Sequence, residues 1–267
     1  MLHYVILSTG SCGNSYAFYD GTDTVVVDMG LTWKKFHETL ERHDIPVESV
    51  RDCFLTHLHP DHSKGGYLLQ TNIPGIKVHI SEISRKMSQS VLFKYKIRQE
   101  EGMLHSFTHG ETIRVGNFSV TPFRTSHDCP GSSGYYIENG EAKLFLMTDT
   151  GLVTEEAHEP AEKAKVLFLE ANYDRDMLMA GPYTAALKKR IQGGYGHLAN
   201  DESAAFAKEH CHIGDELWLI HLSAENNTPE TVETAFRKEL PSGIAVKACE
   251  RGATYEGFIE NEQEKEG

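Results

Sequence analysis

The feature that most constrains this chain is the sequence THLHPDH at residues 56–62, which directly follows the apolar stretch SVRDCFL. That stretch predicts a buried strand, so the polar residues lie in a tight loop at its end. The loop offers four side chains that can bind metal: His57, His59, Asp61 and His62. Imidazole together with carboxylate suits zinc, manganese or iron rather than calcium. A polar surface cluster is the alternative, but crowded histidines repel one another once protonated, so we predict a metal site.

Three other residues that can bind metal also follow apolar strands. His127 comes after SVTPFRTS, Asp149 after KLFLMT and His221 after ELWLI. Each has an ordinary alternative when taken alone: a loop histidine, a helix cap or a strand-end histidine with a hydrogen-bond partner. Because all three share the setting of THLHPDH, we expect them to complete the same metal site.

The predicted strands fall into two blocks, at residues 3–27 and 111–148, and each block is followed by strands that alternate with helices. Ile83, Met87, Val91 and Tyr95 recur every four residues and predict one helix packed on the core. Another helix is expected to start at Pro182. This arrangement favours two sheets packed face to face with helices on their outer faces. Because no linker or repeat interrupts it, we predict one domain over residues 1–267, with a frayed acidic end from about residue 260.

The charge of the chain limits its partners. It carries 39 acidic and 26 basic side chains, a net charge of −13, which argues against a generic polyanion binder. A bound metal or a local basic patch can still reverse the sign at a site, and residues 77–98 carry six basic groups against one acidic group. No apolar run approaches the ~18 residues of a membrane span, and residues 1–10 lack the basic start and apolar stretch expected of a signal peptide. We therefore expect a cytoplasmic protein with no membrane partner.

The segments VVVDMG, THLHPDH, His127, TDTG and IHLS occur in the order of the five motifs of the metallo-β-lactamase fold, and the chain resembles that family over nearly its whole length. The resemblance implies an α/β fold, a four-layer αβ/βα sandwich of two mixed β-sheets, with two divalent metal ions at the edge where the sheets meet. The implied ligands are His57, His59 and His127 for one ion, Asp61, His62 and His221 for the other, and Asp149 bridging both. Asp28, in the first motif, would orient the His-rich loop by hydrogen bonds rather than bind metal.

Five further segments resemble the YycJ/WalJ-like branch of this family, bacterial proteins regarded as DNA exonucleases. They are STGSCGN, LEANYD, DMLMAGPYTAALKKRI, GGYGHLAN and HLSAENNTP. The chain departs from the branch at Tyr173, where a histidine is common, and at Cys129. The resemblance implies a metal-dependent phosphodiesterase, a 5′ to 3′ DNA exonuclease with zinc, manganese or iron. Its nucleophile would be a hydroxide that bridges the metals, because coordination lowers the pKa of water from about 15.7 toward about 7. Asp61 would orient that hydroxide or hold its proton.

A few residues outside the metal ligands are expected to contact the substrate. His197 precedes a predicted helix and is our candidate for phosphate binding or general acid catalysis; a histidine that packs a helix start is the alternative. Ser11 and Asn14 could donate hydrogen bonds to a phosphate, although a plain turn explains them equally well. Glu170 and Asn172 end a strand as the metal ligands do and are expected to line the site.

Two other functions remain open at this level. One is a small-molecule thioester or lactone hydrolase of the glyoxalase II type, because THLHPDHSKGG also carries the Gly-Gly often found there. The other is a regulatory protein that binds metal without turnover. A full set of seven ligands leaves bridging and open positions, which favours an enzyme. Neither the identity of the metals nor the oligomeric state follows from the sequence.

Overall fold

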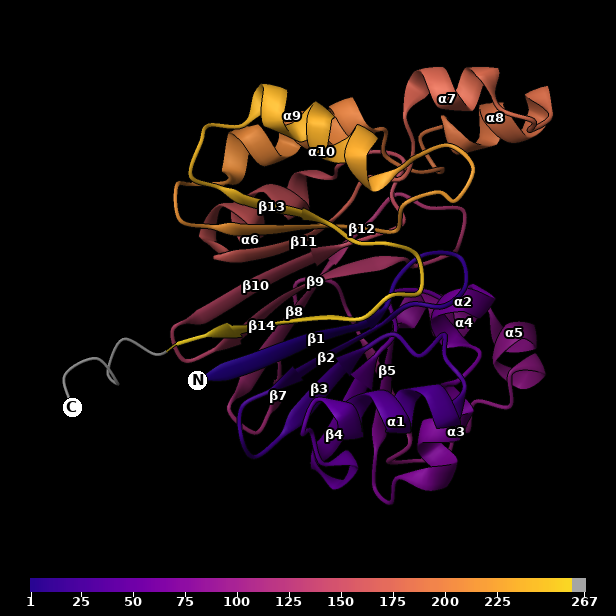
Figure 1. Cartoon of the computed structure of the whole chain (residues 1–267). Coiled ribbons are helices and arrows are strands. Elements are labelled where there is room, and N and C mark those ends of the chain that lie inside the picture. The colour runs from indigo at the N-terminus through magenta and orange to yellow at the C-terminus, as the bar shows by residue number, and fades with distance from the viewer. Residues whose placement is uncertain (261–267) are drawn as a thin grey trace, which may run out of the picture.

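Two seven-stranded mixed sheets pack face to face in the computed structural model, which describes residues 1–260 (Figure 1). The first sheet has the strand order β14-β1-β2-β3-β4-β5-β6 and the second β13-β12-β11-β10-β9-β8-β7. The strands of the first sheet are β1 (Leu2–Ser8), β2 (Ser15–Tyr19), β3 (Thr24–Val27), β4 (Val50–Phe54), β5 (Lys77–Ser81), β6 (Leu104–Phe107) and β14 (Tyr255–Ile259). Those of the second are β7 (Ile113–Val115), β8 (Phe118–Arg124), β9 (Ser133–Asn139), β10 (Ala142–Met147), β11 (Val166–Glu170), β12 (Glu216–Ile220) and β13 (Ala245–Ala248).

Helices cover the outer faces of both sheets and complete the four layers that the resemblance implies (Figure 1). Beside the first sheet lie α1 (Trp33–Arg42), α2 (Pro60–Ser63), α3 (Gly66–Asn72), α4 (Glu82–Met87) and α5 (Gln89–Lys94). Beside the second lie α6 (His158–Lys163), α9 (Asn200–His210) and α10 (Pro229–Glu239), while α7 (Arg175–Ala180) and α8 (Ala185–Ile191) lie together beyond its end. Short 3-10 helices occupy Val47–Ser49 and Glu155–Ala157.

Two helix predictions were wrong in detail. The apolar stripe of residues 83–95 is not one helix on the core, because the chain turns at Ser88 between α4 and α5 and leaves Ile83 and Met87 exposed. The helix expected at Pro182 begins at Ala185, because the side chain of Thr184 accepts a hydrogen bond from the backbone N–H of Leu187 and so caps the helix there.

Aromatic side chains fill the space between the sheets. Phe168 on β11 meets Tyr4 and Phe18 from the opposite sheet at ring-centroid distances of 5.4 and 5.8 Å, both in edge-to-face contact. All three rings are at most 1% exposed, and burying a side chain of this size contributes about 1.5–3 kcal/mol. Separate apolar clusters lie under the helices of each sheet. The packing of these side chains therefore fixes the position of one sheet relative to the other, including the edges at which their strands end.

Strand direction brings the predicted ligands to one edge of the sandwich. β3 and β4 run parallel in the first sheet, and β10, β11 and β12 run parallel in the second. β8 is antiparallel to β9, which is antiparallel to β10, so β8 ends at the same edge as β10. Polar residues that follow these strands thus gather where the carboxyl ends of the strands meet, the usual place for a site in such sheets.

No helix within residues 1–260 is long and apolar enough to cross a membrane. The expectation of a frayed acidic end concerns residues 261–267, which lie outside the described part of the chain.

Candidate metal centre

The His-rich loop after β4 is held by a buried carboxylate. Asp28, fully buried at the end of β3, accepts hydrogen bonds from the backbone N–H of Thr56 at 2.8 Å and from its hydroxyl at 2.9 Å. The other side of the loop is tied in the same way, because His62 Nδ1 lies 2.6 Å from Asp28 Oδ2. Gly30 lets the loop approach, since a β-carbon there would lie 1.7 Å from the Asp61 carbonyl oxygen. The orienting role expected of Asp28 agrees with these contacts.

Three residues at the strand ends adopt left-handed backbone conformations. The φ angles of Asp28, Asp149 and His221 are 61°, 52° and 57°. Such a conformation costs roughly 1–2 kcal/mol for a residue with a β-carbon, and it is concentrated at functional sites. In each case the chain turns directly after the strand, and the residue in the strained conformation is one whose polar side chain belongs to the candidate site.

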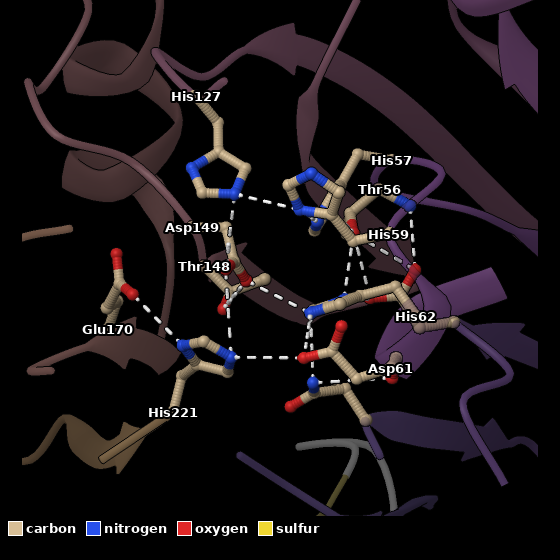
Figure 2. A network of polar contacts seen from close by, with 12 residues as sticks. Thr56, His57, His59, Asp61, His62, His127, Thr148, Asp149, Glu170 and His221 are labelled. Carbon is tan, nitrogen blue, oxygen red and sulfur yellow. Dashed lines mark hydrogen bonds and ion pairs between the residues drawn. The ribbon is translucent and has the colours of Figure 1, made fainter. Parts of the chain in front are cut away.

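The first group of ring nitrogens comes from His57, His59 and His127 (Figure 2). His59 Nδ1 lies 3.1 Å from His57 Nε2 and 3.2 Å from His127 Nε2. Nitrogens bound at 2.0–2.1 Å to one tetrahedral zinc lie about 3.3–3.4 Å apart, so this spacing fits a shared cation. Burial lowers the pKa of all three imidazoles and favours the neutral form, which is the form that binds metal.

A second group adjoins the first and consists of Asp61, His62, Asp149 and His221 (Figure 2). His62 Nε2 lies 3.2 Å from Asp149 Oδ2 and 3.7 Å from Asp61 Oδ2. His221 Nε2 lies 3.7 Å from Asp149 Oδ1 and 3.9 Å from Asp61 Oδ2. Asp149 Oδ1 is also 3.6 Å from His127 Nε2 in the first group. Asp149 is therefore the side chain that lies between the two groups.

His221 provides an independent test of whether a cation fits. Its Nδ1 lies 3.1 Å from the carboxylate of Glu170, which only accepts, so Nδ1 carries a proton. Its Nε2 is buried without a hydrogen-bond partner and faces two carboxylates. Burial opposes a charged ring, but the carboxylates of Asp149, Asp61 and Glu170 together outweigh it and raise the pKa of His221 to about 10. A position that attracts positive charge this strongly suits a metal ion.

The sequence predicts only that Glu170 lines the site, but the structure shows which groups its carboxylate contacts. It is fully buried at the end of β11. One carboxylate oxygen accepts from His197 Nδ1 at 2.7 Å and from His221 Nδ1 at 3.1 Å, and the other accepts from the backbone N–H of Thr150 at 2.9 Å. The apolar run VLFLE places Glu170 at a strand end, but nothing in it indicates that two imidazoles share one carboxylate.

Replacing Glu170 by glutamine is expected to weaken metal binding. Glutamine keeps one acceptor oxygen, so its amide group must face either the two imidazole N–H groups or the Thr150 N–H. Losing a carboxylate behind a metal-binding histidine typically costs 10- to 100-fold in metal affinity or activity. Competition with a chromogenic chelator measures this loss. The matched control is Glu216→Gln at the far end of β12, which should leave metal affinity unchanged; equal affinities for Glu170→Gln and wild type would contradict the expected role.

The residues expected to contact substrate lie around the metal groups in different ways. His197 Nδ1 is occupied by Glu170, so the opposite edge of the ring is the one available to a ligand. Burial opposes its charged form, but Glu170 outweighs this and raises the pKa of His197. Asn14 and Asn172 instead hold loops: Asn14 Nδ2 lies 2.9 Å from His62 Nε2, and Asn172 Nδ2 donates to the His221 carbonyl at 2.8 Å. Ser11 is exposed. Their contacts with substrate stay predictions.

Comparisons with known proteins agree with this architecture. Residues 17–222 match the Beta-lactamase superfamily domain. The chain is 30% identical over 238 residues to the protein named Exodeoxyribonuclease WalJ of Streptococcus pneumoniae serotype 2, covering 89% of this chain and 87% of that protein. It is also 30% identical over 242 residues to Exodeoxyribonuclease YycJ of Bacillus anthracis, covering 90% and 89%. The solved structure of the metallo-beta-lactamase fold protein YhfI from Bacillus subtilis matches with a TM-score of 0.73 at 19% identity, over 96% of this chain and 99% of that chain. The protein therefore belongs to the beta-lactamase superfamily and has the metallo-β-lactamase fold.

Proposed function

We propose that this protein is a metal-dependent hydrolase of phosphodiesters, a nuclease that degrades DNA from an end in the 5′ to 3′ direction. The observation that carries the proposal is the pair of adjacent ligand groups with Asp149 between them. Two divalent ions side by side form a clamp suited to displacement at phosphorus. The choice of DNA follows the names of the two relatives that match about nine-tenths of the chain. We propose that one domain spanning the whole chain carries this activity.

The proposed ligands follow the geometry. His57, His59 and His127 would hold one ion, and Asp61, His62 and His221 the other, with Asp149 between them. Zinc, manganese and iron all accept this donor set. When bound, these ions would neutralise phosphate charge and lower the pKa of the attacking water.

The protein's own groups would then orient and move protons. Asp61, which is partly exposed at the centre, is placed to orient the attacking water or to hold its proton. His197, braced by Glu170, is placed to donate a proton to the departing 3′ oxygen. The acidic surface would keep non-specific DNA affinity low, so binding depends on the metal centre.

A nuclease assay tests this proposal against its two rivals. Purified protein is incubated with DNA labelled at the 5′ or the 3′ end, single- or double-stranded, with Mn²⁺ or Zn²⁺, beside a thioester substrate and the His59→Ala variant. We expect metal-dependent degradation of DNA that a chelator stops, with mononucleotides released first from the 5′ end. Thioester hydrolysis without DNA degradation would support the glyoxalase II type of activity, and metal binding without turnover of either substrate would indicate a regulatory protein.

A further inference from the structure

The loop of residues 193–196, which carries Tyr195, is fixed to the metal centre from two sides. The carbonyl oxygen of Gly196 accepts a hydrogen bond from His127 Nδ1 at 3.1 Å, on the opposite side of the ring from the nitrogen that faces His59. The carbonyl oxygen of Gly194 accepts from Ser126 Oγ at 2.6 Å. The backbone on both sides of Tyr195 is therefore tied to the segment that supplies a proposed metal ligand.

A third contact holds the same loop from the end of β10. Gly151, two residues after Asp149, packs directly on the loop, since a β-carbon there would lie 2.3–2.6 Å from the backbone of residues 193–196. The loop then leads into His197, whose backbone N–H donates to the carbonyl of Ile191 at 2.9 Å. The carbonyl oxygen of Gly196, next to Tyr195, thus lies behind the His127 ring, on the side away from His59.

The side chain of Tyr195 is nevertheless left open to solvent. It is 70% exposed, and its hydroxyl has no hydrogen-bond partner among residues 1–260. Leu152, 58% exposed, packs beside Gly194 in the same loop. A large exposed ring on a rigid loop contributes little to folding. Because the loop of Tyr195 is tied to the segment that supplies His127, we infer that the ring contacts a ligand with a flat apolar face.

The charges near Tyr195 favour a polyanion. Residues 174–197 carry four basic and two acidic side chains, a local excess of two positive charges in a chain of net charge −13. Lys188, Lys189 and Arg190 lie on α8, just before the loop. Arg190 is paired with Asp128, whereas Lys189 makes no ion pair within the described residues. Figure 1 shows that α8, which carries these three cations, lies with α7 beyond the end of the second sheet.

We propose that Tyr195 is a stacking platform for a nucleobase of single-stranded DNA next to the metal centre, with Lys189 beside the adjoining backbone. The proposal rests on the proposed nuclease function and identifies the form of DNA that the site accepts. Stacking on an aromatic ring tolerates every base, and a nearby cation tracks the backbone, as in other single-strand binders. A paired duplex hides the faces of its internal bases, so this device selects an unpaired end.

Steady-state kinetics on a short single-stranded oligonucleotide tests the proposal. We expect Tyr195→Ala to raise KM about 10-fold with kcat within about two-fold, and Tyr195→Phe to retain wild-type values, since stacking is the interaction removed. The metal content of both variants should equal that of the wild type, because neither substitution removes a proposed metal ligand. Ile213→Ala is the control for loss of an exposed apolar side chain: it is 75% exposed and lies before β12, at the end opposite to His221.

A modified substrate makes the test specific to stacking. The substrates are a series of oligonucleotides in which a single abasic nucleotide is placed at successive positions from the 5′ end. At one of these positions the abasic nucleotide should raise the KM of the wild type. At the same position it should leave the KM of Tyr195→Ala unchanged. Equal KM values for Tyr195→Ala and wild type, in an enzyme that degrades DNA, would overturn the stacking role while leaving the nuclease function intact. A wild type that degrades no DNA would instead overturn the proposed function on which it rests.

Discussion

Replacing Asp149 by alanine is expected to abolish DNA degradation, with kcat/KM reduced at least about 1,000-fold. Its carboxylate lies 3.2 Å from His62 Nε2 and 3.6 Å from His127 Nε2, so it contacts both groups of proposed ligands. Without it, the proposed second ion would lose a ligand, and the two proposed ions would lose the carboxylate that lies between the two ligand groups. Metal ions lower such barriers by several kcal/mol, which corresponds to a loss of this size. Metal analysis of the dialysed variant should find about one ion or fewer per chain, compared with about two in the wild type.

The control for this variant is Asp215→Ala. Asp215 is equally buried, and it accepts hydrogen bonds from Lys165 and from the backbone of His212, but it lies just before β12, at the end of the strand remote from His221. It should lower thermal stability without changing metal content. An Asp149→Ala variant that retained two ions and wild-type kcat/KM would show that Asp149 does not hold the centre together.

The site edge was the most predictable part of the fold, for a simple physical reason. Apolar strands such as ELWLI run through the buried core of the sandwich. A polar residue that directly follows such a strand therefore lies at the edge of the sheet, where the strand leaves the core. Strand direction then brings together residues as distant in sequence as His62 and His221. The family model and the structural neighbour confirm the four-layer α/β fold predicted from these patterns and from the family resemblance.

Other features depended on tertiary contacts that a periodic pattern does not contain. The stripe from Ile83 to Tyr95 has helical spacing throughout, yet the chain turns at Ser88, a residue that is acceptable both inside a helix and at its end. The sequence predicts Glu170 only as a residue near the site, because its role arises from two imidazoles that reach it from different segments. Asn14 and Asn172 carry the right groups for binding phosphate, but their amides contact His62 and the backbone of His221 in the folded chain.

Replacing His197 by alanine is expected to lower kcat on DNA about 100-fold while metal content stays unchanged. General acid catalysis typically contributes 10²- to 10⁴-fold to the rate. The position of His197 suits this role, because its Nδ1 forms a 2.7 Å hydrogen bond with Glu170 and its ring centroid lies 5.2 Å from that of His127. We expect a loss of kcat at the lower end of this range because solvent can supply a proton when the ring is absent.

The choice of leaving group distinguishes proton donation from phosphate binding by His197. The 3′ oxygen of a nucleotide leaves as a strong base and needs a proton, whereas p-nitrophenolate is weakly basic and leaves without one. If His197 is the acid, His197→Ala should lose about 100-fold on DNA but less than about three-fold on the p-nitrophenyl ester of thymidine 5′-phosphate. Equal losses on both substrates would assign His197 to phosphate binding, and unchanged kinetics on both would remove it from the mechanism. Because Glu170 braces the ring through Nδ1, a donor at this position must use Nε2, so His197→Asn, whose amide reaches only as far as Nδ1, should behave like His197→Ala.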